Sequence, residues 1–172
     1  EHLSNLTRKP DVIIISNPSN PTGAVYNHEN IGELFMHLKS KESMLIVDEI
    51  YSGLSYGSKI KSALSLAENI IVVNGFSKTY AMTGWRLGWM VVPSDLVRPI
   101  QKIAQNVFIS PPTISQHAAL KVFDAADELE VMRKTYQKRR DFLLPELRRL
   151  GFKMPVKPEG AFYIYTGIEK WG

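Results

Sequence analysis

Polar side chains that could do chemistry follow three short apolar runs of the sequence. The runs are 11–16 (DVIIIS), 44–47 (MLIV) and 70–73 (IIVV). The polar residues that come after them are, in the same order, Asn20, then Asp48 with Tyr51, then Ser77 with Lys78. In open α/β sheets, ligands bind beyond the carboxyl ends of parallel strands. If the runs are neighbouring parallel strands, these side chains converge on one crevice.

The chemistry of this set is that of a phosphorylated aromatic aldehyde site. Lys78 offers an amine that can act as a nucleophile, and Asp48 offers a permanent anion. Arg86 offers a planar fork for phosphate, while Asn20 and Tyr51 can donate to a phenolate oxygen. Pyridoxal phosphate (PLP) needs each of these: a Schiff-base amine, a carboxylate for its ring nitrogen, positive charge for its phosphate and donors for its phenolate.

Each residue also has a structural interpretation that the sequence leaves open. Asp48 could cap the turn that follows it, and Tyr51 could pack in the core with its hydroxyl satisfied. Arg86 could form an ion pair with Asp48 or Glu49. Residues 17–23 could be a run of tight turns without a ligand, since Asn, Pro and Gly are ordinary turn residues.

The elements that must position these residues are those of an α/β protein. The three runs are short, continuous and rich in β-branched residues, which is typical of strands buried in a parallel sheet. Between the first two, apolar residues recur with helical spacing at Ile31, Leu34, Phe35 and Leu38, and Asn27 can cap that helix. We therefore predict a mostly parallel sheet flanked by helices. A further strand, 87–92, follows without a full helix before it, which is compatible with antiparallel pairing.

The second half of the chain is predicted to be helical and to lead into a second domain. Helices are expected at 95–107 and 114–126, followed by a long helix at 128–150 that is kinked or broken near Leu144 by Pro145. An extended segment, a turn at 158–160 and a strand should follow. The domain hypothesis is that residues 1–127 belong to a cofactor-binding large domain, 128–150 form an interdomain helix, and 151–172 begin a small α+β domain.

Composition excludes several classes of function. The 172 residues carry a net charge of +4, and the basic residues lie mostly in amphipathic patterns, which argues against nucleic acid binding. There is no cysteine, and His28, His37 and His117 show no metal-ligand spacing, so no metal site is predicted. No apolar run reaches the length of a membrane span, and no signal peptide is visible. We expect no membrane association and a cytoplasmic location.

Four motifs, in this order along the chain, resemble the class I/II aminotransferases, which are fold type I PLP-dependent enzymes. The motifs are NPSNPTG (17–23), VDEIYSGL (47–54), SKTYAMTGWRLGW (77–89) and PEGAFY (158–163). The resemblance implies that Lys78 forms the Schiff base with PLP and then moves the proton of the substrate α-carbon. It also implies that Asp48 pairs with the pyridinium nitrogen, that Asn20 and Tyr51 bind the phenolate oxygen, and that Arg86 binds the phosphate.

One position departs from the family pattern. A phosphate-binding serine often lies three residues before the lysine, and this sequence has Gly75 there. Ser77 is the candidate to replace it. The departure bears on the strength of phosphate binding and leaves the family resemblance intact.

The resemblance implies a PLP-dependent enzyme that moves an amino group from an amino acid to a 2-oxo acid, as a homodimer. Two alternatives remain: a PLP-dependent lyase or synthase of the same fold, and a non-catalytic aminotransferase-like domain of a regulator. Family members are more than twice this length, and their glycine-rich phosphate turn and carboxylate-binding arginine have no match in this sequence. We therefore expect these 172 residues to be the middle portion of such a chain, with the large domain incomplete, and to be inactive alone.

Overall fold

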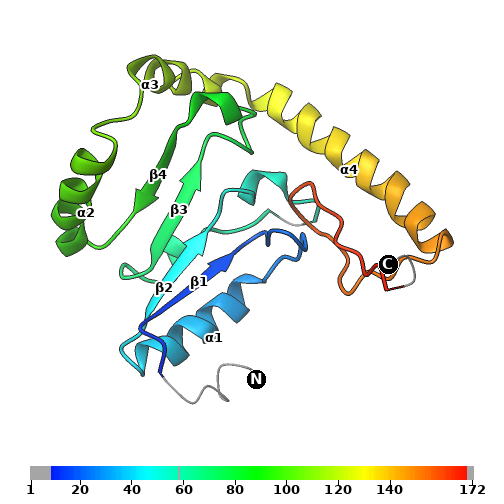
Figure 1. Cartoon of the computed structure of the whole chain (residues 1–172), viewed down its shortest axis with the longest axis horizontal. Coiled ribbons are helices and arrows are strands. Elements are labelled where there is room, and N and C mark those ends of the chain that lie inside the picture. Colours follow the sequence, from blue (N-terminus) through cyan, green and yellow to red (C-terminus); the bar gives the residue numbers. More distant parts are fainter. Residues whose placement is uncertain (1–8, 58, 170–172) are drawn as a thin grey trace.

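The computed structural model describes residues 9–57 and 59–169, which form a four-stranded sheet in the order β1-β2-β3-β4. The strands are β1 (Val12–Ser16), β2 (Met44–Asp48), β3 (Ile71–Gly75) and β4 (Gly88–Val91). The first three run parallel and β4 pairs antiparallel with β3 (Figure 1). The prediction of a mostly parallel α/β sheet is confirmed.

Helix α1 (His28–Lys39) covers one face of the sheet and makes the main core with it. The Asn27 side chain caps the helix by accepting from the amide of Asn30 at 2.7 Å. The apolar stripe faces inward, where Ile31 and Leu38 are 2% and 1% exposed. It packs against residues of β2 and β3, so the expected helix and its capping residue are both present. The buried members of this core are Ile31, Phe35, Leu38, Leu45, Val47, Ala63, Ile70 and Val72.

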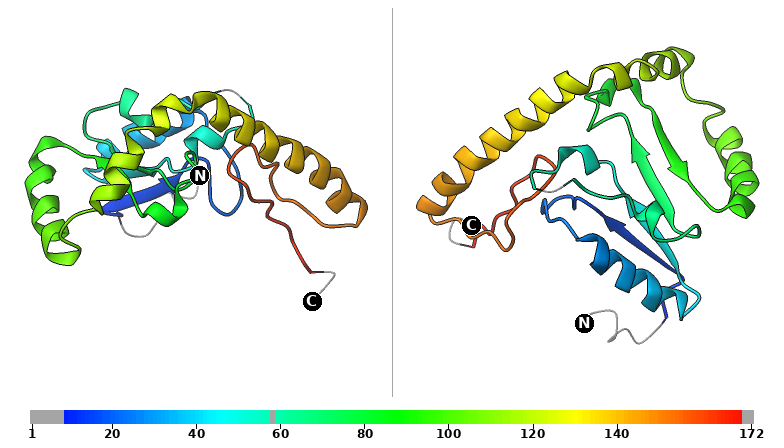
Figure 2. Two further views of the ribbon diagram at one scale, coloured as in Figure 1. Left: turned by 90° about the horizontal axis from the view of Figure 1, so that it is seen from above. Right: turned by 180° about the vertical axis from the view of Figure 1, so that it is seen from behind.

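The remaining helices lie away from that core. They are α2 (Ser94–Val107), α3 (Thr113–Ala119) and α4 (Ala126–Arg149), with short 3-10 turns at Ser52–Leu54, Ala63–Ser65, Thr83–Trp85 and Val122–Asp124. Helix α4 extends from the end of α3 past the sheet, and the last described residues fold back beneath it (Figures 1 and 2). In the described part of the chain, no helix is long and apolar enough to cross a membrane.

Three details differ from the sequence-based expectations. Helix α4 continues through Pro145 without a break. Pro145 removes one amide donor to Asp141, a residue that is exposed to water. Helix α3 ends at Ala119 where a helix to 126 was expected, and a 3-10 turn follows.

The strand expected after residue 160 is absent from the described residues. Only two isolated bridges form there, Ser55 with Gly160 and Lys153 with Gly167. The sequence Ala161–Thr166 is rich in strand-forming residues, but a strand requires a continuous partner, and the described residues provide none at that point.

Candidate functional site

The carboxyl ends of β1, β2 and β3 lie side by side. Ser16 pairs with Asp48, and Asp48 pairs with Val73, so the three loops that follow leave the same edge of the sheet (Figure 1). These loops carry Asn20, Tyr51 and Lys78. The topology therefore brings the predicted side chains to one edge, as the pattern of strands requires.

The loop after β1 is fixed by its own hydrogen bonds. Asn17 is 2% exposed, and its side chain accepts from the Tyr26 amide at 2.9 Å and donates to the Tyr26 carbonyl at 3.2 Å. The Gly23 amide donates to Ser19 O at 2.8 Å, closing the turn. Asn17 thus has a structural role, while Asn20 is exposed at the tip of the loop.

The C-terminal segment packs directly on this loop. The amides of Glu159 and Gly160 both donate to Gly23 O, at 2.8 and 3.0 Å. Gly23 has a φ of +69°, and a Cβ there would lie 2.6 Å from Pro158 Cβ, so only glycine allows the approach. Two motifs that are more than 130 residues apart in the sequence, 17–23 and 158–163, are therefore in contact.

Tyr51 lies at the centre of an aromatic cluster formed with that segment. It is 2% exposed, and its ring meets the rings of Phe162 and Tyr163 edge to face, at centroid distances of 5.3 and 5.6 Å. Its hydroxyl is 2.5 Å from the Tyr163 hydroxyl. Burial, followed by the Tyr163 hydroxyl and the Asp48 charge, raises the pKa of Tyr51 well above its ordinary value. Tyr51 is therefore a neutral hydrogen-bond donor at any working pH.

Two adjacent carboxylates at the end of β2 have different environments. Asp48 is partly exposed, and its Oδ1 accepts from the Ile50 amide at 3.0 Å, so the capping alternative holds for this oxygen. Within residues 9–57 and 59–169, no cation pairs with Asp48. Glu49 is 5% exposed and accepts from the Ala63 amide at 2.7 Å, and burial raises its pKa. Asp48 is therefore the carboxylate that a ligand can reach, whereas Glu49 has a structural role.

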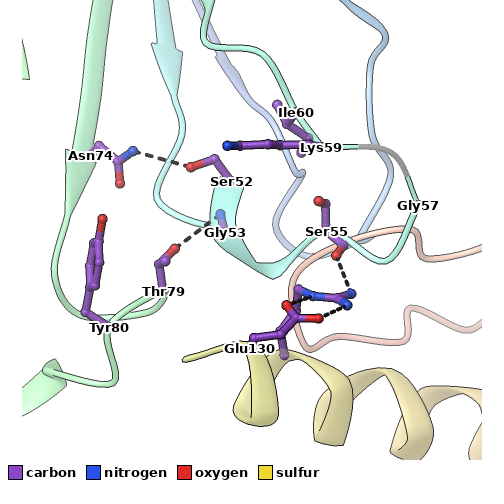
Figure 3. A pocket seen from close by; sticks show the side chains of 11 residues that line it. Ser52, Gly53, Ser55, Gly57, Lys59, Ile60, Asn74, Thr79, Tyr80 and Glu130 are labelled. Carbon is purple, nitrogen blue, oxygen red and sulfur yellow. Dashed lines mark hydrogen bonds and ion pairs between the residues drawn. The ribbon is translucent and has the colours of Figure 1, made fainter. Parts of the chain in front are cut away.

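The loop that carries Lys78 is attached to the loop that carries Tyr51. Thr79 Oγ1 accepts from the Gly53 amide at 3.3 Å and approaches Ile50 O at 3.5 Å (Figure 3). A Cβ on Gly53 would lie 2.2 Å from Thr79 Cγ2, so the contact depends on glycine. Lys78 Nζ lies 5.8 Å from the centre of the Phe162 ring, the same ring that Tyr51 meets. The Lys78 amine and the Tyr51 ring thus both lie beside the Phe162 ring.

A cavity of about 400 Å³ borders the Gly53–Thr79 contact. Its walls include Ser52, Asn74 and Tyr80, and Figure 3 shows the Asn74 amide directed at the Ser52 hydroxyl, 3.5 Å away. Sequence reasoning identified neither Gly53 nor Thr79 as part of the site. The glycine in VDEIYSGL was the only signal available for this contact.

The phosphate-binding candidates Ser77 and Arg86 lie near the two ends of the loop between β3 and β4 that carries Lys78. Arg86 is exposed, has a φ of +52°, and donates from Nη1 to Thr83 O at 3.0 Å. In the described part of the chain it pairs with neither Asp48 nor Glu49, so that alternative is not realised. The Ser77 carbonyl accepts from the Thr83 hydroxyl at 2.8 Å. These bonds join the two ends of the loop between Ser77 and Arg86.

Gly75 is packed where the family pattern often has a serine. A Cβ there would lie 3.3 Å from both Ile50 Cδ1 and Leu87 O, which is tighter than ordinary contact. The antiparallel partner of Gly75 is Gly88. A side chain at this position would therefore press on the β3–β4 pairing, which accounts physically for the glycine.

The chemistry of the donor set fits PLP. The described residues contain no group of three metal-ligating side chains. They provide an amine and a tyrosine ring beside one phenylalanine, a carboxylate at the end of the middle parallel strand, and an exposed guanidinium. Nothing in this arrangement conflicts with an aromatic aldehyde phosphate held between them.

The fold is that of an α/β protein with a mostly parallel sheet, a class in which ligands bind at the carboxyl edge of the strands, where these side chains lie. The family description "Aminotransferase class I and II" matches residues 1–171, and the chain belongs to that family.

Related proteins agree with this assignment over most of the chain. The aspartate aminotransferase of Sulfurisphaera tokodaii is 38% identical over 168 residues, which are 96% of this chain and 42% of that protein. The (5-formylfuran-3-yl)methyl phosphate transaminase of Methanocaldococcus jannaschii is 41% identical over 172 residues, covering 97% of this chain and 45% of that protein. A solved aminotransferase from Mycobacterium tuberculosis superposes with a TM-score of 0.91 at 36% identity, over 99% of this chain and 45% of that one. The chain spans less than half the length of these relatives.

Proposed function

We propose that the protein to which these residues belong is a PLP-dependent aminotransferase that moves an amino group from an amino acid to a 2-oxo acid. The observation that carries the proposal is the meeting of three strand-end loops at residues 162 and 163. Lys78 Nζ lies 5.8 Å from the centre of the Phe162 ring, the Tyr51 ring lies 5.3 Å from it, and the Asn20 amide lies 3.5 Å from the Tyr163 hydroxyl. Family membership supports the same conclusion, because these relatives are named as aminotransferases.

Bound PLP supplies an electron sink that stabilises negative charge on the substrate α-carbon. Lys78 would hold the cofactor through its amine and would carry the α-proton of the substrate. Asp48 would supply the negative charge that keeps a proton on the ring nitrogen. Asn20 and Tyr51 would donate to the phenolate oxygen, and Arg86 with Ser77 would bind the phosphate.

The substrates and the assembly belong to this proposal as well. The relatives differ in their named substrates, one acting on aspartate and one on a furan phosphate, so we propose the amino donor only as a class. We also propose a homodimer in the cytoplasm. Light scattering on the whole protein tests the dimer.

The lysine assignment is tested with the whole protein and added PLP. The wild type should develop a visible absorbance band that saturates at one PLP per chain, and Lys78→Ala should abolish this band. Lys138→Ala, an exposed lysine on α4, is the matched control and should keep the band. A band of equal strength in Lys78→Ala would overturn the assignment. An aminotransferase should convert the donor amino acid into its 2-oxo acid and convert a second 2-oxo acid into its amino acid. This pair of products separates amino transfer from lyase or synthase chemistry.

A further inference from the structure

The Tyr163 hydroxyl contacts both of the side chains that are proposed to bind the phenolate oxygen. It is 2.5 Å from the Tyr51 hydroxyl, and the Asn20 amide donates to it at 3.5 Å. Neither the sequence motifs nor the resemblance assigned a role to this residue. We infer that Tyr163 is a positioning residue that holds Tyr51 and Asn20 in the arrangement from which both reach one ligand oxygen. The identity of that ligand as PLP rests on the proposed function.

Tyr163 is held in place by the backbone that precedes it. The Tyr56 amide donates to Glu159 O at 2.8 Å, and the Tyr56 hydroxyl donates to Ala161 O. Burial raises the pKa of Tyr56 to about 12, so this hydroxyl stays a donor. The guanidinium of Arg140 lies over the Tyr56 ring at 4.6 Å and donates to Pro158 O at 2.9 Å. These contacts fix the segment before Tyr163, so Tyr163 can in turn hold the side chains that it contacts.

Ring packing adds to this support. The Tyr163 ring contacts Phe162 at a centroid distance of 4.9 Å and Tyr51 at 5.6 Å. Phe162 in turn lies 5.8 Å from Lys78 Nζ. Residues 162 and 163 thus connect all three strand-end loops. Tyr163→Phe would keep the ring contacts and remove only the hydroxyl.

The hydroxyl has the right chemistry for two partners at once. It can accept from Asn20 and donate to the Tyr51 oxygen, which leaves the Tyr51 proton free for a ligand. A hydroxyl that accepts a hydrogen bond becomes a stronger donor itself. Asn20 keeps a second amide hydrogen for the same ligand oxygen. Tyr163 therefore acts through Tyr51 and Asn20 and does not need to touch the cofactor.

The test compares Tyr163→Phe with Tyr165→Phe in the whole protein. Tyr165 lies on the same segment and is 50% exposed, which makes it the matched control. Quenching of tryptophan fluorescence by PLP should give a dissociation constant about fivefold higher for Tyr163→Phe, the effect of one hydrogen bond. The pH midpoint of the visible band of the PLP-loaded protein should rise by about half a unit, because a weaker donor stabilises the phenolate less. Tyr165→Phe should change neither.

Coupling to Tyr51 separates positioning from a general loss of structure. In a Tyr51→Phe background, Tyr163→Phe should raise the dissociation constant by less than about twofold, because its main partner is already gone. Equal effects in both backgrounds would contradict the inference. Tighter PLP binding by Tyr163→Phe would also overturn it, since the hydroxyl would then be a competitor of the ligand.

A measurement without PLP makes failure of this inference distinguishable from failure of the proposed function. NMR of ¹³Cζ-labelled tyrosine in the ligand-free protein follows the ionisation of Tyr51, whose titratable neighbours are Tyr163 and Asp48. Tyr163→Phe should shift the pKa of Tyr51, and Tyr165→Phe should not. An unchanged Tyr51 titration would show that the two hydroxyls are not coupled, whatever the protein binds. A shifted pKa together with no visible band in the wild type would overturn only the proposed function.

Discussion

Asp48 and Glu49 show how neighbouring side chains of the same chemistry acquire different roles. Residues that alternate along a strand end face different surroundings. Glu49 turns into the core, where the Ala63 amide holds it, and Asp48 remains partly exposed at the sheet edge. The sequence alone could not separate them by type. The burial of Glu49 leaves Asp48 as the acid that a ligand can reach.

The Glu49 carboxyl should make the fold less stable as pH rises. Its folded pKa is raised by burial above the ordinary value, so the stabilising protonated form is fully present at low pH and is lost as pH rises through the folded pKa. Glu49→Gln keeps an oxygen for the Ala63 amide and removes the charge. The free energy of unfolding of the variant relative to the wild type should therefore increase from pH 4 to pH 8. Urea unfolding at each pH measures this.

The matched control for that series is Glu33→Gln, an exposed residue on α1. It should follow the wild type across the same pH range. If Glu49→Gln also parallels the wild type, the carboxyl is not held in its protonated form by the fold.

Asp48→Asn tests the proposed anion without removing the cap on Ile50. The amide oxygen can still accept from the Ile50 amide, so folding and the visible band with PLP should be kept. Turnover should fall by about 10²- to 10³-fold, because a preorganised charge at the reacting group is lost. Single-turnover rates with an amino acid measure this, with Asp95→Asn on α2 as control. A change in turnover of no more than about twofold, far smaller than the expected loss, would exclude the proposed role of Asp48.

The strands that position the site could be predicted because each is a short run of apolar, β-branched residues, and such a run indicates a buried strand without any information about distant contacts. The runs 11–16, 44–47 and 70–73 became Val12–Ser16, Met44–Asp48 and Ile71–Gly75. Helix α1 was predictable from its apolar spacing and its asparagine cap. The end of α3 was not, because it depends on a distant contact: the turn after it brings the Phe123 ring to 5.9 Å from Tyr80.

The site itself was only partly predictable for the same reason. The topology gives the approximate places of four site residues, because Asp48 ends β2 and the other three, Asn20, Tyr51 and Lys78, lie in the loops that follow strands. The roles of Gly53, Thr79 and Tyr163 depend on which loops touch, and no local pattern reports that. Close approach of two loops is visible in the sequence only as a glycine.

The contact between the loops after β2 and β3 should depend on Gly53. Gly53→Ala places a Cβ 2.2 Å from Thr79 Cγ2, and the loop that carries Lys78 must move. We expect a loss of about 1–3 kcal/mol in the free energy of unfolding, typical of overpacking, and weaker PLP binding. Chemical denaturation and PLP titration measure the two effects.

Gly57→Ala is the matched control for this change, because no atom lies within 4 Å of the Cβ it would add. It should be close to neutral. A second change, Thr79→Ala in the Gly53→Ala protein, removes the clashing methyl and should restore part of the stability. Equal losses in Gly53→Ala and Gly57→Ala would show that backbone freedom, and not the loop contact, is responsible.

The molecule has its main buried core between helix α1 and the sheet, and large apolar side chains are exposed in several other parts of the described chain. Helix α1 and strands β1–β3 enclose the buried cluster, while α2 and α3 lie beyond β4 (Figures 1 and 2). All four residues of β4 are exposed. Large apolar side chains from β4 to the start of α3 are also exposed; they are Trp89, Met90, Val91, Val97, Ile103, Val107, Phe108, Ile109 and Ile114. A stretch that exposes this many apolar side chains is a candidate surface for association.

The 172-residue chain, expressed on its own, should therefore self-associate and bind PLP weakly. Dyes that bind apolar surfaces should fluoresce with it, and light scattering should show a mass that rises with concentration. Ile103→Lys with Val107→Lys should reduce both signals, because these α2 side chains are 65% and 74% exposed and placing charges there opposes association. Val131→Lys on α4, at 65% exposure but outside the segment from β4 to α3, is the control for added charge and should have a smaller effect. A monomeric, dye-silent chain that binds PLP tightly would show that the four-stranded sheet and its three loops suffice for the site, and that tight binding does not need the additional length found in the relatives.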